Sequence, residues 1–292
     1  MRLTDNTRFN AVAGPTDLLL TAAPVAAFGF LGNNPAAIAI QGSTLQVADG
    51  KALSLVGGNQ GFTATDPDTG NPIPVLGGIT MTGGKLAAPG GQINIASVAG
   101  PGEVSAVDFM PTPGMAMGNI SLSQGALLDV SSDAGGTIQI RGGQLVISDS
   151  TLAANTINSN GASVAVDIQV SGDLSLIDTT GVTSISAQTS GAGNAGAVNI
   201  SSANLTASTS NSGFPGVVMI DTHTSGSGKG GDVNITTGNL DASSSVLVNS
   251  ISIFVDTGFT ANGHGGNVSI AASRFNMFLQ TITAGDFRLI FS

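Results

Sequence analysis

The chain has 292 residues, of which 42 are glycine, 12 are phenylalanine and none is tryptophan, tyrosine or cysteine. Charged residues make up 9% of the chain, and 18 acidic against 8 basic side chains give a formal net charge of −10 at pH 7. This composition excludes disulfides and thiolate metal sites. It also argues against nucleic acid and anionic membranes as partners, because Lys and Arg form no cluster.

The first apolar run, Leu18–Leu31, is too short for a membrane-spanning helix, and Pro24 interrupts it. A signal peptide has basic residues directly before its apolar run, whereas Asp17 occupies that position here. We therefore expect buried strands in this run, no visible export signal and no membrane-spanning segment. Residues 1–60 are assigned to N-terminal strands and the first turns of a repeat array.

Turn-forming residues dominate residues 61–78, for which we expect a loop insertion. Within this insertion, Asp66, Asp68 and Gly70 have the spacing found at the start of a calcium-binding loop. An EF-type loop needs further oxygen ligands and a later glutamate. We therefore favour a solvated loop over an ion site.

Residues 79–292 contain a recurring motif, in which glycine and a small residue precede alternating apolar and polar residues. When each copy is measured at its last apolar residue, the steps along the chain are 45, 30, 30, 35 and 35 residues. A near-periodic array of this kind indicates a solenoid, and the alternation predicts strands rather than helices. The copies are Gly90–Ile95, Gly135–Ile140, Gly196–Ile200, Gly230–Ile235 and Gly265–Ile270, with Val166–Val170 as a glycine-poor relative.

Two further strands follow within each unit. Leu205 and Leu240 each lie five residues after the last isoleucine of the leading strand, inside the pattern Asn-Leu-x-Ala-Ser. A third strand follows at Val217–Ile220 and within Val246–Val255. The pattern predicts three strands per turn, stacked about 4.8 Å apart, with apolar residues inside. Because a minimal three-strand turn needs only about 20 residues, we also expect either one longer surface loop per turn or irregular turns.

The stretch Ser225–Ile235 (SGSGKGGDVNI) has two readings, a phosphate-binding loop or a corner between strands. A Walker loop has glycine five residues before its Gly-Lys pair and Ser or Thr after the lysine. This chain has His223 and Gly230 at those positions. The glycine-aspartate nonapeptide of calcium-binding rolls does not fit either, because the unit does not recur every nine residues. We therefore interpret Gly230 and Gly231 as a corner, where glycine adopts backbone conformations that other residues avoid.

Cleavage of a glycan would require clustered carboxylates. Asp129 and Asp133 are four residues apart and Asp167 and Asp173 are six apart, while Asp129, Asp167 and Asp232 occupy outward strand positions if the register holds. We interpret these residues as a solubilising acidic face. The arginines that would be needed to bind an anionic glycan are scattered, at Arg2, Arg8, Arg141, Arg274 and Arg288.

The two histidines, His223 and His264, lie 41 residues apart in turns rich in Gly, Ser and Thr. Two histidines without a third ligand make a weak metal site, so we interpret both as exposed turn residues. No nucleophile-elbow pattern marks a catalytic serine. We expect no catalytic, cofactor-binding or metal-binding residues.

Several stretches resemble a known family. Residues 79–99 (ITMTGGKLAAPGGQINIASVA), together with Leu53–Gly58 and Pro101–Val104, look like the filamentous-haemagglutinin-type exoproteins of two-partner secretion, particularly the large cyanobacterial-style group. Residues 135–156 (GGTIQIRGGQLVISDSTLAANT) and residues 228–235 are similar to the shaft repeats of that group. Residues 28–35 (FGFLGNNP) resemble the end of its secretion domain.

This resemblance implies a right-handed parallel β-helix, export through an outer-membrane partner transporter, and an extracellular or cell-surface product. Residues 1–60 would adjoin the secretion domain, and residues 79–292 would form the shaft. We therefore expect a non-enzymatic, adhesin-like segment that presents loops and side faces to a glycan or another cell-surface ligand. The alternatives are a carbohydrate-binding or carbohydrate-cleaving parallel β-helix and a purely structural spacer.

Overall fold

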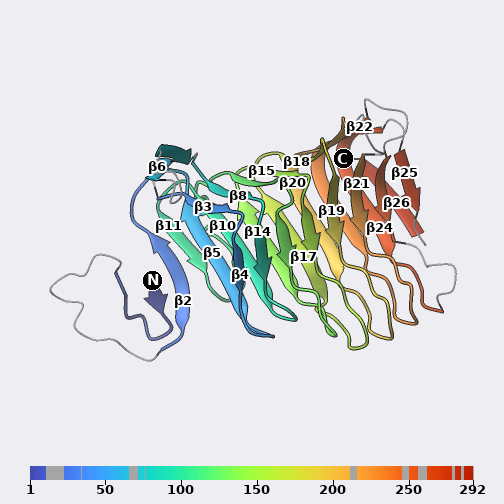
Figure 1. Cartoon of the computed structure of the whole chain (residues 1–292), viewed down its shortest axis with the longest axis horizontal. Coiled ribbons are helices and arrows are strands. Elements are labelled where there is room, and N and C mark those ends of the chain that lie inside the picture. Colours follow the sequence, from blue (N-terminus) through green and yellow to red (C-terminus); the bar gives the residue numbers. More distant parts are fainter. Residues whose placement is uncertain are drawn as a thin grey trace.

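The computed structural model describes residues 1–10, 23–33, 35–65, 72–75, 77–210, 216–244, 250–255, 262–277, 280–283 and 286–291. Within these residues the chain forms strands and turns and no helix. The strands run across the long axis of the molecule and follow one another along it (Figure 1). The protein is therefore all-β, and most of its strands lie in parallel sheets.

The parallel strands form three stacks, which the chain visits in turn. The first stack contains β5 (Ala52–Gly58), β10 (Gln92–Val98), β14 (Thr137–Gly142), β17 (Val164–Val170), the leading halves of β20 (Ala197–Thr209), β22 (Val233–Ser244) and β24 (Asn267–Met277), and β26 (Asp286–Phe291). The second stack contains β3 (Ile38–Gln41), β8 (Ile79–Thr82), β12 (Ile120–Ser123), β15 (Leu145–Ser148), β18 (Leu174–Asp178) and the trailing halves of β20, β22 and β24. The third stack contains β4 (Thr44–Gln46), β9 (Lys85–Ala87), β13 (Leu127–Asp129), β16 (Thr151–Ala153), β19 (Val182–Ser186), β21 (Val217–Asp221), β23 (Ser250–Phe254) and β25 (Gln280–Thr283).

The prediction of three strand segments per unit is confirmed, but the first two are not always separate strands. In β20 and β22 the leading and trailing segments join into strands of 13 and 12 residues. The trailing segment carries the repeated Asn-Leu-x-Ala-Ser pattern, and Leu205 pairs with Leu240 in register as expected. These long strands unite the first and second stacks into one sheet, while the third stack forms a second sheet.

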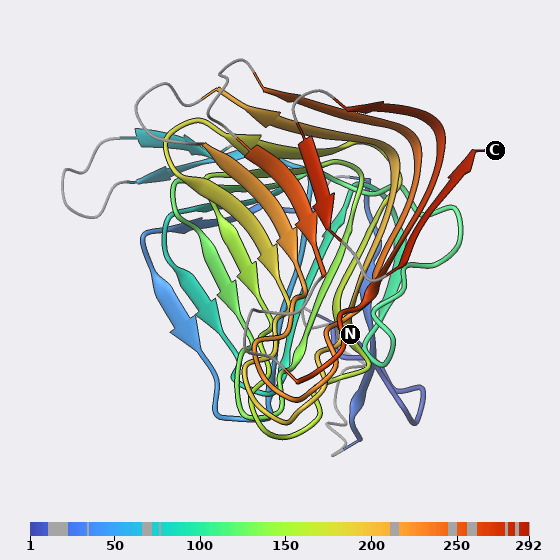
Figure 2. The ribbon, with the colours of Figure 1, turned by 90° about the vertical axis from the view of Figure 1, so that its right-hand side faces the viewer.

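One apolar core runs through the interior that the three stacks enclose (Figure 2). Alternate residues of each strand point into it, so that Ile95, Ile140 and Ile200 are at most 3% exposed. Fully burying an aliphatic side chain of this size stabilises the fold by about 1.5–3 kcal/mol. This core consists almost entirely of Ile, Leu, Val and Ala, with Met81 buried in it and Phe275 packed against it.

One predicted register is wrong. We measured the repeat at Val170, but Ile168 is the residue that pairs with Ile140 on one side and with Ile200 on the other. Val170 lies opposite Gly142 instead. Ile168 and Val170 both face inward, so alternation alone could not choose between them, and a bulge between Val164 and Val166 shifts the register locally.

The glycine corner also forms for a different reason than predicted. We expected a left-handed or otherwise sterically awkward backbone at this corner, but the φ of Gly231 is not positive; a Cβ at this position would lie 2.1 Å from the carbonyl oxygen of Gly196 in the preceding unit. The same contact recurs between Gly266 and Gly231, at 1.9 Å. Glycine is needed here because consecutive corners stack too closely for a side chain. At Gly90, where φ is +61°, the expected left-handed conformation does occur.

Two small antiparallel sheets accompany the stacks. The segment 61–78, expected as a loop insertion, contains the paired strands β6 (Phe62–Thr65) and β7 (Pro72–Val75). The other sheet joins β1 (Arg2–Leu3), β2 (Val25–Phe30) and β11 (Gly102–Ser105). A second apolar cluster lies between this sheet and the outer side of the first stack, formed by Ala96, Val98, Val104 and Phe109 with Phe28, Phe30, Val56, Met115 and Met117.

The apolar run 18–31, for which we expected buried strands, forms a strand only in part. Residues 25–30 form β2, in which Ala27 is buried, but Leu31 is 90% exposed. Residues 18–22 lie outside the described part of the chain. The described residues include no apolar helix of the length needed to cross a membrane.

Candidate functional site

Along the molecule, the outer side of the first stack changes from apolar and covered to polar and more exposed. On β5 and β10 its outward residues include Val56 and Ala96, which the antiparallel sheet covers. On β17, β20 and β22 most of the outward residues are polar and are half-buried or exposed. They form a shallow groove, which we call the amide face, defined by Asp167, Gln169, Asn199, Ser201, Asn234 and Thr236.

Strand register arranges the amide face in two columns. Asp167, Asn199 and Asn234 lie opposite one another on successive strands, and so do Gln169, Ser201 and Thr236. Neighbouring parallel strands lie about 4.8 Å apart, so each column presents a polar group at that interval. The inward residues between the columns, Ile168 and Ile200, are buried in the core, which fixes the direction in which the polar side chains point.

An ion pair closes the N-terminal end of the amide face. Arg141 Nη2 donates to Asp167 Oδ2 at 2.5 Å, and Arg141 Nη1 donates to the backbone oxygen of Asp167 at 2.9 Å. The Arg141 side chain is only 3% exposed, and that of Asp167 is 18% exposed. The Gln169 amide donates to both carboxylate oxygens of Asp167, at 3.3 and 3.2 Å. The buried guanidinium group of Arg141 thus offsets the negative charge of the Asp167 carboxylate.

The remaining groups of the amide face are neutral donors and acceptors. Asn234 Nδ2 donates to Asn199 Oδ1 at 2.9 Å, so the two amides align along the column. Hydroxyl groups of Ser201 and Thr236 stand beside them in the second column. Amides and hydroxyls can both donate and accept hydrogen bonds, so this groove suits a ligand with many neutral hydroxyl groups.

The other carboxylates that the sequence singled out do not form pairs with one another. Asp129 Oδ2 accepts a hydrogen bond from Lys85 Nζ at 2.8 Å, and Asp232 Oδ1 accepts one from Lys229 Nζ at 3.3 Å. Asp133 accepts from Ser159 at 2.6 Å, and Asp173 accepts from Asn204 at 2.7 Å. Each carboxylate therefore has its own partner.

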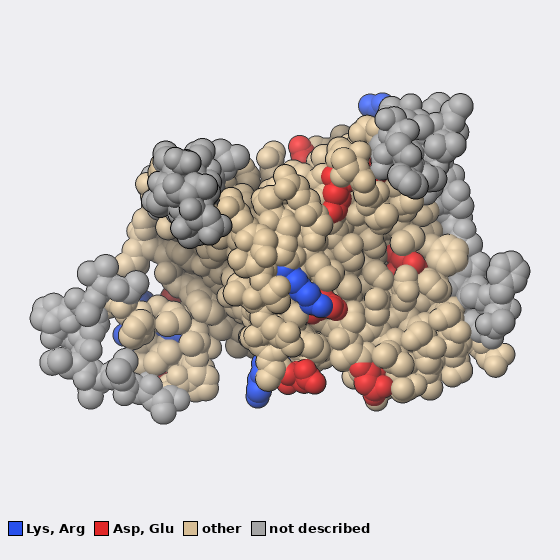
Figure 3. Space-filling view, in the orientation of Figure 1, with Lys and Arg blue, Asp and Glu red and all other residues tan. Residues whose placement is uncertain are grey.

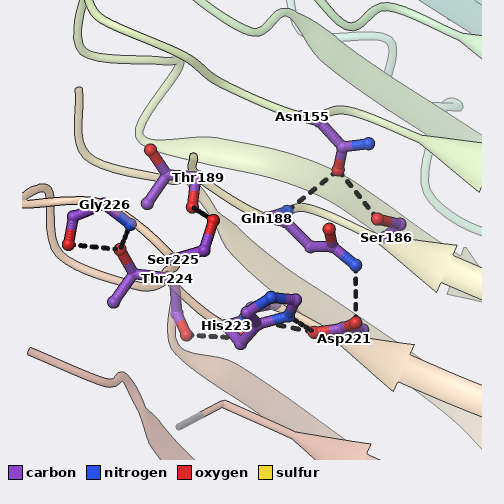
Figure 4. A network of polar contacts seen from close by, with 11 residues as sticks. Asn155, Ser186, Gln188, Thr189, Asp221, His223, Thr224, Ser225 and Gly226 are labelled. Atoms are coloured by element: carbon purple, nitrogen blue, oxygen red, sulfur yellow. Dashed lines mark hydrogen bonds and ion pairs between the residues drawn. The ribbon is translucent and has the colours of Figure 1, made fainter. Parts of the chain in front are cut away.

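His223 does not lie exposed in a turn as we predicted. It is half-buried, its Nδ1 lies 2.7 Å from Asp221 Oδ1, and its ring meets Phe254 edge-on at 5.2 Å. Asp221 also accepts a 2.5 Å hydrogen bond from Gln188, as Figure 4 shows. The contact with Phe254, which lies one unit further along the chain, could not be predicted from local sequence. His264 is exposed, as predicted.

The polar network around His223 is internally satisfied. Asn155 Oδ1 accepts from Ser186 Oγ at 2.7 Å and from the backbone N–H of Gln188 at 2.9 Å (Figure 4). Within the described residues, no group of three potential metal-binding side chains comes together. Asp66, Asp68 and Gly70, which resembled the start of a calcium loop, lie outside the described residues.

The carboxylates that do meet are a pair that we did not predict. Asp149 and Asp178 both accept a hydrogen bond from the backbone N–H of Gly181, at 3.2 and 3.0 Å. A sequence signal was present, because each aspartate follows a core leucine by four residues, in Leu145–Asp149 and Leu174–Asp178. Asp178 is 0% exposed, so a polysaccharide cannot reach it.

The charged side chains visible on the surface in Figure 3 are few and scattered, with no large patch of one sign. Comparison with protein-family models finds no match, and comparisons with curated proteins and with solved structures find none either.

Proposed function

We propose that this chain is a non-enzymatic segment of a secreted, adhesin-like exoprotein, folded as a right-handed parallel β-helix, that binds an extended neutral glycan along its amide face. Three in-register parallel stacks around one core support the β-helix. The open face of Asp167, Asn199 and Asn234 beside Gln169, Ser201 and Thr236 is the observation that carries the binding role. The outer-membrane transporter and the extracellular location follow from the family resemblance.

Charge supports a neutral ligand. The chain carries a net charge of −10, and the cation nearest to the groove, Arg141, is buried and paired with Asp167. A polyanionic glycan would gain no ion pair on the amide face and would meet long-range repulsion. Hydrogen bonds to hydroxyl groups are weak individually, so attachment would depend on many contacts along a chain and on several protein copies.

The carbohydrate-cleaving alternative receives less support. Cleavage needs two carboxyl groups that flank an accessible glycosidic bond. The carboxyl pair formed by Asp149 and Asp178 is closed to a polymer, because Asp178 is fully buried. The carboxylate on the amide face, Asp167, is engaged by Arg141 and Gln169, and the residues that define this face include no second carboxyl group.

Retention on polysaccharides tests the proposal. Purified protein is mixed with insoluble cellulose, chitin and mannan, and with immobilised alginate as a polyanion. We expect retention on at least one neutral polymer and none on alginate. Substituting Asn199→Ala and Asn234→Ala together should weaken binding at least tenfold.

The matched control combines Asn204→Ala with Asn239→Ala, which removes the same two side chains from the second stack and should leave binding unchanged. Equal binding by the two double variants would contradict the assignment of the face. Absence of retention on every polymer would favour a structural spacer, and release of new reducing ends would establish the cleaving alternative.

A further inference from the structure

The turn that joins the second and third stacks holds two carboxyl groups from consecutive units. Asp149 follows β15, and Asp178 ends β18, the next strand of the same stack. The backbone N–H of Asp149 donates to the carbonyl of Ile177 at 3.0 Å. Since the Gly181 N–H also contacts both Oδ1 atoms, the two side chains are direct neighbours.

Asp149 has many hydrogen-bond donors. Its Oδ1 accepts from the backbone N–H groups of Thr179, Thr180 and Gly181, at 2.8, 3.0 and 3.2 Å. Its Oδ2 accepts from the hydroxyls of Thr179 at 2.6 Å and Ser148 at 3.2 Å. This arrangement stabilises a carboxylate anion, because all five donors favour the charged form.

Asp178 is in the opposite situation. Its side chain is fully buried, Oδ1 has the Gly181 N–H, and Oδ2 has no hydrogen-bond donor. An ionised carboxylate with a bare, buried oxygen beside a second anion is strongly disfavoured. The described ion pairs are Arg2–Glu103, Lys85–Asp129, Arg141–Asp167, His223–Asp221 and Lys229–Asp232, so none of them compensates either charge.

We propose that Asp178 keeps its proton at neutral pH and shares it with the neighbouring carboxylate of Asp149, so that the two groups hold one proton that links consecutive units. The pair then carries one negative charge in place of two. The directions of the pKa shifts of the two aspartates agree with this proposal. Burial, with a contribution from the charge of Asp149, raises the pKa of Asp178. For Asp149, burial is outweighed by the hydrogen bonds from Thr179 and Thr180, and its pKa falls to about 2.

This link should weaken with rising pH. Because the pKa of Asp178 is higher in the folded chain than in the unfolded chain, its contribution to stability is complete below the unfolded value and is lost as pH rises through the folded value. Between the unfolded and the folded pKa of Asp178, the equilibrium constant for unfolding should increase by up to tenfold per pH unit from this group alone, and above the folded pKa it should level off. The inference does not depend on glycan binding.

Carboxyl ¹³C chemical shifts of the full chain, labelled at aspartate and recorded at pH 6–7, test the proposal directly. We expect Asp178 to give the shift of a protonated carboxyl group and Asp149 that of a carboxylate. A carboxylate shift at Asp178 would overturn the proposal.

Denaturant unfolding between pH 4 and pH 9 gives a second test. The variant Asp178→Asn keeps the shape of the side chain and supplies an uncharged donor, so it should lose the rise in the unfolding constant that the unsubstituted protein shows. The control Asp49→Asn, at an exposed turn, should retain that rise. Identical pH profiles for Asp178→Asn and the unsubstituted protein would overturn the proposal. Addition of Ca²⁺ gives a further check. If Ca²⁺ raises the melting temperature of the unsubstituted protein but not that of Asp178→Asn, the carboxyl pair holds a cation and the proposal is overturned.

Discussion

The side-chain amide of Asn239 donates to Oδ1 of Asn204 at 2.7 Å, although the two residues lie 35 positions apart in the chain. Asn204 in turn donates to Asp173 Oδ1 at 2.7 Å. On the neighbouring stack, Asn234 donates to Asn199 with the same direction, and Asp167 stands next in that column. Each amide column thus has a carboxylate at its acceptor end.

The first prediction concerns this column. Substituting Asn204→Ala removes the acceptor of Asn239 and the donor to Asp173 together, and should lower the free energy of unfolding by about 1 kcal/mol. Denaturant unfolding at pH 7 measures the change. Asn262→Ala, at an exposed position outside the strands, is the matched control and should stay within about 0.5 kcal/mol of the unsubstituted protein. Equal effects at the two positions would mean that the column does not stabilise the fold.

The second prediction separates two kinds of glycine. At Gly231 a Cβ would lie 2.1 Å from a backbone oxygen, whereas at Gly181 it would meet nothing within 4 Å. Gly231→Ala should therefore cost about 3 kcal/mol, because the overlapping atoms belong to the backbone. Gly181→Ala should be neutral or stabilising by up to about 1 kcal/mol, since it restricts the unfolded chain. Comparable losses from both substitutions would refute the close stacking of corners.

The third prediction concerns a small cavity in the core. Ala207 and Ala242 follow Leu176 in one inward column, and the missing volume leaves an apolar cavity of about 40 Å³. Ala242→Val should fill part of it and add about 1 kcal/mol to the free energy of unfolding, at about 0.8 kcal/mol per buried methylene. The exposed Ala203→Val is the control, with no expected change. A loss of stability in Ala242→Val alone would show that this part of the core is already filled.

The fourth prediction concerns acid. The pKa of Asp149 is lowered to about 2, because hydrogen bonds from the 179–181 turn outweigh burial. Its contribution to stability is therefore complete above the unfolded value of 3.8 and is lost as pH falls through about 2. Asp149→Asn should destabilise the protein at pH 6 by at most about 2 kcal/mol, which solvent screening reduces. The difference from the unsubstituted protein should shrink between pH 4 and pH 2, and a constant difference would argue against the ionised role of Asp149.

Local alternation made much of the parallel fold predictable. Ile200, Ile235 and Ile270 recur every 35 residues with the same neighbours, so their pairing could be read from the repeat and is confirmed. Ile168 was not predicted as the partner of Ile140, because Val170 also points inward and alternation does not distinguish the two. The antiparallel cover was missed because Phe28 and Phe109 join the same apolar cluster only through tertiary packing.

The candidate site, too, could be predicted from the sequence only in part. The outward direction of Asp167 followed from alternation, but its partner Arg141 belongs to the preceding unit and needed the correct register. Gly231 was predicted to lie at a corner, yet the reason is contact between units and not its own backbone angles. For Asp149 and Asp178 the aligned Leu-x-x-x-Asp pattern was available, but only packing reveals that Asp178 lacks a donor.

The central claim is that successive units stack in parallel and in register, which places the polar columns side by side. The chain contains no cysteine, so introduced pairs can be cross-linked without background. Ser201 pairs with Thr236, and Thr206 pairs with Asp241. A short bismaleimide should link the double variant Ser201→Cys with Thr236→Cys, and likewise Thr206→Cys with Asp241→Cys, but not Ser201→Cys with Asp241→Cys. Efficient linking of the mismatched pair, or none in the two matched pairs, would contradict the stack on which the amide face depends.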